Sequence, residues 1–276
     1  MDDLERRNAT FIQCPIGCSF LLLSEAYRLN IADLLRVDIA LHLAARTISH
    51  LSVWRQDHAE AIQAALAEGP RLLPVARDLL RRDTTRWWFG PFDRNAQIWV
   101  APFDQGSAPA PAVDPPRQPT EFDRYIQRPF GALVTTTLID GTIPMLAAER
   151  EGAGDLGGTL RPPLVRYRLS VSPAARIFSI DAPADWRRLC ESFPATEPGG
   201  LHGGLLTPDF GAVAREWDAV HLSFGGVLSA VQAPLDGPAG RTELDSWETE
   251  QTIWLRWAFD SVTRLPDVLD IIPSPL

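Results

Sequence analysis

The hydrophobic pattern of this chain changes near Thr84, and that change constrains the fold more than any other feature. Between residues 24 and 46 apolar side chains recur at the spacing of one helical face, and similar patterns continue to residue 82. After Thr84, short runs rich in aromatic and β-branched residues are typical of strands. The sequence therefore predicts helices over residues 19–82 and mainly strands over 84–265, packed as one α+β body.

This boundary separates a helical N-terminal region, residues 1–83, from an α+β region, residues 84–276, in which a catalytic site is expected. A proline- and alanine-rich stretch at 105–119 and a glycine-rich stretch at 152–158 are expected to be loops. Strands are expected within the runs 86–91, 97–100, 128–137, 164–171, 175–180, 217–226 and 251–259, and a short helix at 183–190.

The charged residues of the chain exclude some classes of binding partner and of catalytic chemistry. The 276-residue chain has a formal net charge of −9 and a pI near 5.1, which argues against a nucleic-acid-binding protein that depends on overall charge. All 26 basic residues are arginine. The lack of lysine excludes Schiff-base chemistry and the phosphate-binding lysine of P-loop enzymes.

The cysteines and the first residues predict a cytoplasmic protein. Cys14, Cys18 and Cys190 are odd in number, and a chain of this length needs no disulfide framework, so free thiols in a reducing compartment are expected. Residues 1–5 are acidic, unlike a secretory signal. The apolar run 16–23 is too short to span a bilayer, and no membrane partner is expected.

The common catalytic motifs do not occur in the sequence. It contains no Gly-x-Ser-x-Gly, His-Glu-x-x-His, Walker or dinucleotide fingerprint. No metal site is predicted, and His42, His50 and His58 are interpreted as surface or packing residues. A nucleophile pair of Cys190 and His221 stays open as an alternative, as does glycoside hydrolysis by paired carboxylates.

Two carboxylates precede the last strongly apolar run of the chain. Glu248 and Glu250 stand two residues apart, directly before a run rich in β-branched and aromatic residues. If both belong to the leading edge of the strand, its period of two places them on one face. Like charges that close disfavour each other's ionised form, which makes the pair a candidate site. The alternative interpretation is a polar turn before a strand.

The order of three segments resembles the mono-ADP-ribosyltransferases of the arginine–serine–glutamate type. The run Val-Thr-Thr-Thr at 134–137 is similar to that family's Ser-Thr-Ser strand, and the segment 165–177 is similar to its middle sheet segment. Glu-Thr-Glu at 248–250, followed by the apolar 253–255, resembles the family's Glu-x-Glu strand. The resemblance covers about residues 84–265. It implies a split, mostly antiparallel sheet against which the N-terminal helical segment packs.

The resemblance also implies a chemistry, with NAD as the substrate. Glu250 would stabilise the oxocarbenium-like ribosyl cation that forms when nicotinamide leaves, and Glu248 would orient or deprotonate the acceptor. A tryptophan, Trp247 or Trp254, could stack on the nicotinamide ring. The residues expected to hold the pocket and NAD are Arg86, Thr135, Thr136, Thr137 and Trp254.

The chain departs from that family at the early arginine and in the hydroxyl strand. The hydroxyl strand reads Thr-Thr-Thr, and an insertion is required before the glutamates. Arg86 is the choice for the arginine because it opens the first strand-like run, and Arg94 is an alternative. A second assignment uses Arg166 or Arg168 as the early arginine and His-Leu-Ser at 221–223 as the hydroxyl strand.

Two functions of different classes follow from these observations. The first is an NAD-consuming enzyme, an ADP-ribosyltransferase or NAD glycohydrolase of bacterial toxin or effector type, with a protein acceptor or a cognate inhibitor protein as partner. The second is a non-catalytic protein-binding protein of immunity or antitoxin type, for which the acidic charge suits a basic partner. A hydrolase of another class remains a third possibility. Thermal stabilisation by NAD would distinguish the first two.

Overall fold

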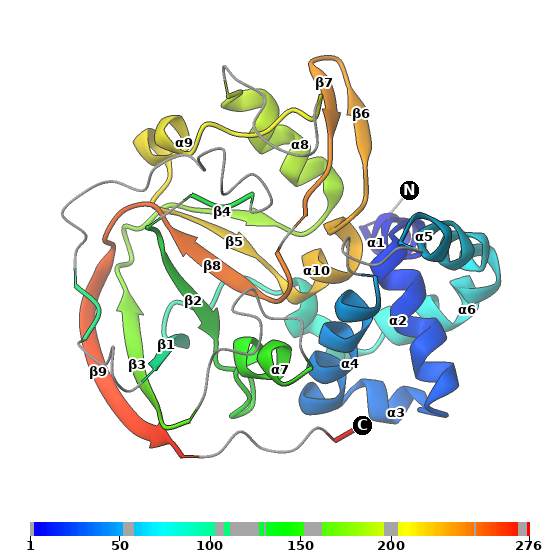
Figure 1. The fold of residues 1–276 in the computed structure, drawn as a ribbon, viewed down its shortest axis with the longest axis horizontal. Coiled ribbons are helices and arrows are strands. Elements are labelled where there is room, and N and C mark those ends of the chain that lie inside the picture. Colours follow the sequence, from blue (N-terminus) through cyan, green and yellow to red (C-terminus); the bar gives the residue numbers. More distant parts are fainter. Residues whose placement is uncertain are drawn as a thin grey trace.

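The computed structural model describes residues 3–51, 58–102, 108–110, 127–129, 131–151, 162–195, 204–245, 247–269 and 275–276. Most of the loop expected at 105–119, and all of the loop expected at 152–158, lie outside these ranges. The described chain combines helices with a mostly antiparallel sheet, as the sequence predicts (Figure 1).

The helices predicted in the first part of the chain are confirmed. Proline begins α2 and lies at the start of α6, where its missing N–H costs no hydrogen bond. Asn30 caps α3 by accepting hydrogen bonds from the amides of Ala32 and Asp33. The helices are α1 (Asp3–Gln13), α2 (Pro15–Ala26), α3 (Ile31–Leu34), α4 (Val37–His50), α5 (His58–Ala67) and α6 (Gly69–Leu80).

The second part holds a seven-stranded sheet with the order β4-β5-β8-β2-β1-β3-β9, in which only β4 and β5 are parallel. Its strands are β1 (Gln97–Pro102), β2 (Leu133–Thr137), β3 (Leu164–Val171), β4 (Ile177–Ile180), β5 (Ala219–Leu222), β8 (Gln251–Trp254) and β9 (Phe259–Val268). A separate hairpin and short helices complete it: β6 (Leu235–Gly237), β7 (Gly240–Thr242), α7 (Pro144–Arg150), α8 (Pro183–Ser192), α9 (Phe210–Glu216) and α10 (Phe224–Ala230).

The run that was expected to form the first strand, residues 86–91, does not form one. Residues Asp83–Phe89 form a 3-10 helix, η1. Its aromatic side chains pack into a cluster instead of a sheet: the ring of Trp87 stacks on Phe224 at 4.8 Å, and the ring of Trp88 lies edge-on to Phe20 at 5.9 Å. Burial of these rings against α2 and α10 outweighs their preference for strands.

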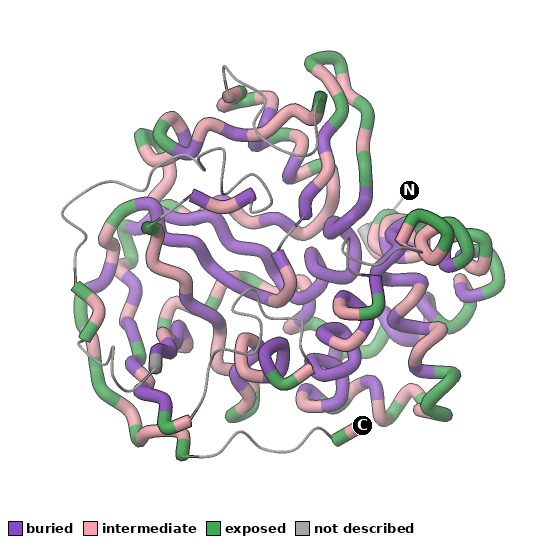
Figure 2. The backbone as a smooth tube through the Cα atoms, viewed as in Figure 1, coloured by how far each residue is buried: buried purple, intermediate pink, exposed green. Residues whose placement is uncertain are grey.

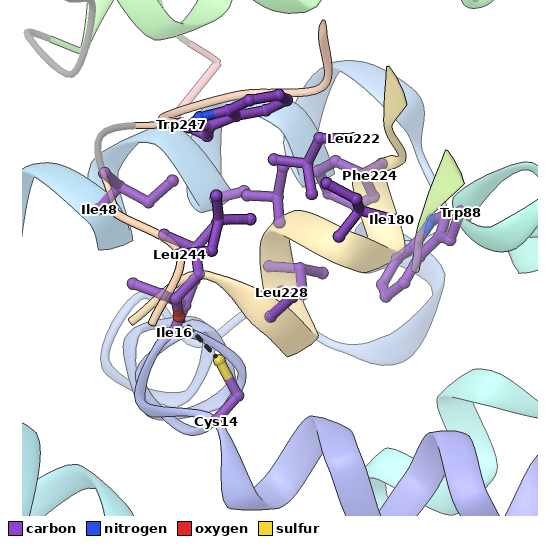
Figure 3. Packing of buried hydrophobic residues seen from close by; sticks show 14 of the residues in the cluster. Cys14, Ile16, Ile48, Trp88, Ile180, Leu222, Phe224, Leu228, Leu244 and Trp247 are labelled. Atoms are coloured by element: carbon purple, nitrogen blue, oxygen red, sulfur yellow. Dashed lines mark hydrogen bonds between the residues drawn. The ribbon is translucent and has the colours of Figure 1, made fainter. Parts of the chain in front are cut away.

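One hydrophobic core joins the N-terminal helices to the sheet. Figure 3 shows Cys14, Ile16 and Ile48 beside Leu228 and Leu244, and all five residues are buried. The thiol of Cys14 donates to the carbonyl of Val231 at 3.2 Å, and the Gln232 amide donates to the carbonyl of Leu51 at 3.1 Å. The described parts of the two regions therefore share one interior.

Burial follows the position of each strand in the sheet. All residues of β5 and β8 are buried, whereas most residues of β9 at the sheet edge are exposed or half-buried (Figure 2). Polar residues on the central strands must therefore find partners inside the protein. Among the described helices, no single one is long and apolar enough to cross a membrane; the bent pair α1–α2 passes by length and composition only.

Candidate active site at the junction of β2 and β8

The pairing of two strands brings the predicted hydroxyl strand to the predicted carboxylate. β2 runs antiparallel to β8, with Val134 opposite Ile253 and Thr135 opposite Thr252. Continued by two residues, this register sets Thr137 opposite Glu250, which directly precedes β8. Segments more than a hundred residues apart in the chain are thus neighbours because of strand register alone.

Glu250 is held by three hydrogen-bond donors from the end of β2. Its Oε2 accepts from the Thr136 hydroxyl at 2.6 Å and from the Thr137 amide at 2.8 Å. Its Oε1 accepts from the Thr137 hydroxyl at 2.6 Å. The residue is only 3% exposed. Burial raises the pKa of this carboxyl above its ordinary value, and the three donors oppose that effect without cancelling it.

The described residues place no arginine within ion-pair distance of Glu250; the nearby basic group is His221 on β5. Its Nδ1 lies 3.7 Å from Glu250 Oε1 and 3.0 Å from the Thr252 hydroxyl. Burial lowers the pKa of His221 to about 4, so the ring is neutral at pH 7. Neutral donors, not a cation, therefore surround the Glu250 carboxylate in the described structure.

Thr135 belongs to the same polar cluster but does not contact Glu250. Its hydroxyl donates to Gln97 Oε1 at 2.6 Å and accepts from the Trp254 indole N–H at 2.8 Å. Trp254 is 2% exposed, and its ring packs against Phe259 at 4.3 Å. Trp247 is fully buried and donates from its indole to the carbonyl of Gln127 at 3.0 Å. Neither indole ring therefore has an exposed face on which nicotinamide could stack, contrary to the expectation from the sequence.

Glu248 lies apart from Glu250. Residues 249 and 250 form a bend and β8 begins at Gln251, so the period-two argument does not apply to the pair. Burial raises the pKa of Glu248 to about 7; Arg128 lowers it, and the carboxylates of Asp245 and Glu149 raise it further. The two glutamates therefore have different neighbours and different electrostatic environments.

Arg86 is not a site residue in this structure, which corrects the expectation from the sequence. It lies on η1, its side chain is 82% exposed, and it pairs with Asp83 at 2.9 Å. The alternative Arg94 binds two backbone carbonyls, of Ser172 at 2.7 Å and of Ala175 at 2.8 Å, and so ties a loop. Neither arginine contacts Glu250.

The structure also separates the residues of the second assignment, in which Arg166 or Arg168 was the early arginine and 221–223 the hydroxyl strand. Arg166 donates from Nε to the carbonyl of Pro266 at 2.9 Å, and Arg168 is exposed on β3. Only His221 of that assignment lies beside Glu250.

Gln97 is the residue that the sequence analysis missed. It opens β1, is fully buried, and bridges Thr135 and Thr137 with the two ends of its amide. β1 carries no arginine: its sequence is QIWVAP. A single polar residue at the start of an otherwise apolar strand was the signal available in the sequence. Its partners could not be named without the register between β1 and β2.

A cavity of about 700 Å³ lies elsewhere, between the N-terminal helices and the sheet edge. None of the main predicted site residues lines it, although Arg166 does. Charges of both signs border it: Arg36 pairs with Asp38 at 2.7 Å, and Asp140 lies on the β2–α7 turn. The cavity is therefore separate from the Glu250 cluster.

The remaining candidate groups are inert in this setting. All three cysteines are free and buried, and burial raises the pKa of Cys14 to about 12, that of Cys18 to about 11, and that of Cys190 above its ordinary range. A thiol in that state is a poor nucleophile. Within the described ranges, no three His, Cys, Asp or Glu side chains form a metal-binding group.

Comparison with protein-family models, with curated proteins and with solved structures gives no match to this chain. The interpretation of the site therefore depends on its geometry and chemistry.

Proposed function

We propose that this protein consumes NAD, as an ADP-ribosyltransferase or NAD glycohydrolase of bacterial toxin or effector type, with Glu250 as the catalytic carboxylate. One observation carries the proposal: the hydroxyls of Thr136 and Thr137 both donate to Glu250 at 2.6 Å. The resemblance joins a hydroxyl strand to a glutamate strand, and β2 and β8 are adjacent. The early arginine of that resemblance has no counterpart on β1.

The proposed reaction requires a negative charge held in a fixed position beside the ribose. Cleavage of the nicotinamide–ribose bond develops positive charge on the ribose, and a carboxylate already in place lowers the barrier without reorganising. In a buried site that interaction is stronger than in water. Hydrogen bonds to both oxygens of Glu250 fix its orientation and favour its ionised form.

Glu248 is proposed to act on the acceptor. Its pKa of about 7 suits a general base, because the group is partly ionised at neutral pH and is still basic enough to take a proton. Arg128 interacts electrostatically with Glu248 and donates to the Gln251 side chain at 3.1 Å. This arrangement separates cation stabilisation by Glu250 from acceptor activation by Glu248.

The non-catalytic binding protein is the second candidate, and one observation favours it. Glu250 is 3% exposed and both its carboxylate oxygens already accept hydrogen bonds. In this second candidate the enclosed carboxylate joins β2 to β8, in the way that buried polar networks specify a fold. A protein of this second kind would not bind NAD.

The proposal is tested by nicotinamide release from NAD, measured by chromatography with purified full-length protein. Glu250→Gln keeps the size of the side chain and removes its charge, so the rate is expected to fall by a factor on the order of 100 or more. NAD should also raise the melting temperature of the wild type, since a ligand that binds the folded state stabilises it.

Glu248→Gln makes the same substitution two residues away, at the group proposed to act on the acceptor. We expect it to spare NAD hydrolysis and to reduce transfer to an acceptor. If the wild type neither releases nicotinamide nor gains stability with NAD, the transferase proposal is wrong and the binding-protein candidate replaces it.

A further inference from the structure

A chain of hydrogen bonds runs across three strands and ends at Glu250. It begins at the indole N–H of Trp254 on β8, which donates to the Thr135 hydroxyl on β2 at 2.8 Å. Thr135 donates to Gln97 Oε1 on β1 at 2.6 Å, and Gln97 Nε2 donates to the Thr137 hydroxyl at 3.0 Å. Thr137 in turn donates to Glu250 Oε1 at 2.6 Å. Most of the side chains in this series of hydrogen bonds are buried.

The direction of the bonds in this hydrogen-bond chain is set by the Gln97 amide. One end of the amide contacts both the backbone carbonyl of Asp93, at 3.1 Å, and the Thr137 hydroxyl. A carbonyl can only accept, so that end is the nitrogen and the amide oxygen faces Thr135. The Thr135 hydrogen is therefore directed to Gln97 Oε1, while its oxygen accepts from the indole N–H of Trp254, which can only donate.

The orientation of the amide has a consequence for Glu250. Because the Thr137 oxygen accepts from Gln97, its single hydrogen is directed to Glu250 Oε1. A protonated Oε1 would place two hydrogens between the same pair of oxygens. The hydrogen-bond chain therefore keeps a proton off Oε1, and Oε2 accepts from the Thr137 amide; acceptance at both oxygens favours the carboxylate.

We propose that Gln97 is a positioning residue of this site: its amide directs the Thr137 hydroxyl toward Glu250 and so favours the ionised carboxylate. This inference rests on the proposed function, in which ionised Glu250 stabilises the ribosyl cation. Gln97 touches neither substrate nor reacting atoms in this role. It acts through Thr137, and it stands on the early strand where the resemblance expects an arginine.

The effect is expected to appear as a pH dependence. Among the described residues, the groups that face Glu250 are Thr136 and Thr137 from β2 and, from β5, His221, which is neutral above its pKa of about 4. Loss of the Gln97 donor weakens a hydrogen bond to the charged form and therefore raises the pKa of Glu250. Since the ionised form is the active one, the acid limb of the activity profile moves to higher pH.

The experiment follows the Glu250 carboxyl directly, by carbon-13 NMR titration of full-length protein labelled at the glutamate carboxyl carbons. The Glu250 signal is identified by its loss in Glu250→Gln. Gln97→Met keeps the length of the side chain and removes both polar atoms of the amide; its Glu250 midpoint is expected to rise by about one to two pH units. At pH values below both midpoints, the rate of nicotinamide release should fall roughly tenfold for each unit of that shift, because only the ionised fraction is active.

Gln232→Met is the matched control. It makes the same substitution at another buried glutamine, whose amide donates to the carbonyl of Leu51 and takes no part in the Glu250 chain. It should lower stability without moving the Glu250 midpoint. If Gln97→Met does not fold, Thr135→Val replaces it: loss of the bond that orients the amide oxygen should raise the midpoint in the same direction by a smaller amount.

The outcomes separate the inference from the proposed function. A folded Gln97→Met, or in its place Thr135→Val, whose Glu250 midpoint equals that of the wild type overturns the role of Gln97, even if the wild type consumes NAD. A shifted midpoint in a protein that releases no nicotinamide supports the role of Gln97 and refutes the transferase proposal alone.

Discussion

Glu248 and Glu250 differ in their surroundings although a single residue separates them. Glu250 meets three donors at the end of β2, whereas Glu248 meets Arg128 and the negative charges of Asp245 and Glu149. The bend at residues 249 and 250 turns the two side chains to different neighbours. At the scale of single residues, therefore, local backbone direction decides the chemistry of each carboxylate.

The raised pKa of Glu248 predicts a pH effect on stability. In the folded protein it titrates at about 7 rather than 4.5, so between these values the folded state binds more protons than the unfolded state. The contribution of Glu248 to the free energy of unfolding therefore falls as pH rises from about 4.5 to 7. Glu248→Gln removes this dependence.

Chemical denaturation at several pH values checks the expectation. As pH rises from 4.5 to 7, the unfolding free energy of the variant should increase relative to that of the wild type, by about 3 kcal/mol at most. A difference that stays constant over this range would mean that Glu248 keeps its ordinary pKa in the folded protein.

At the scale of elements, glycine allows the helix α2 to approach α10 closely. A Cβ on Gly17 would meet the carbonyl oxygen of Phe11 far inside van der Waals contact, and that of Leu228 at 2.7 Å. Both are backbone atoms, which cannot move aside as a flexible side chain can. Gly17 therefore sets the distance between the N-terminal helices and the helix that follows β5.

Gly17→Ala is expected to destabilise the protein by about 1–3 kcal/mol or more, because the added methyl group forces the two helices apart. Thermal or denaturant unfolding measures the change. Gly211→Ala in α9 is the control: its Cβ would meet only Asp209 Oδ1, at 3.1 Å, and alanine favours a helix over glycine. Equal effects of the two substitutions would contradict a close approach at Gly17.

At the scale of the whole molecule, an ion-pair network adds to the shared core. Glu151, at the end of α7, accepts from Arg46 Nε at 2.7 Å and lies 2.9 Å from His42 Nδ1, both on α4. Its side chain is 4% exposed. A buried carboxylate that loses such partners becomes costly, so the network links the two parts of the chain strongly.

Residues 84–276 expressed alone are therefore expected not to fold cooperatively. Removal of residues 1–83 would expose the apolar surface that Ile16 and Ile48 cover and would leave Glu151 without its partners on α4. Heteronuclear NMR of the fragment should show poor dispersion, and mixing with a 1–83 peptide should restore it. A well-dispersed spectrum of 84–276 alone would show that it is an independent domain.

The sequence by itself determined the type of most elements and the groups available for chemistry. Helices over 19–82 and strands within the runs 97–100, 128–137 and 164–171 were readable, because apolar spacing reports directly on the period of each element. The run at 86–89 was misjudged, since its aromatic residues favour strands locally but are buried by α2 and α10.

Only the tertiary structure decided which groups meet. The contact of Glu250 with Thr136 and Thr137, and the bridge formed by Gln97, depend on the order β8-β2-β1 and on register across more than a hundred residues. Local periodicity holds no information about such pairing, because a strand presents the same backbone donors and acceptors to any neighbour. The packing of side chains from the whole chain selects one register, and that selection created the site.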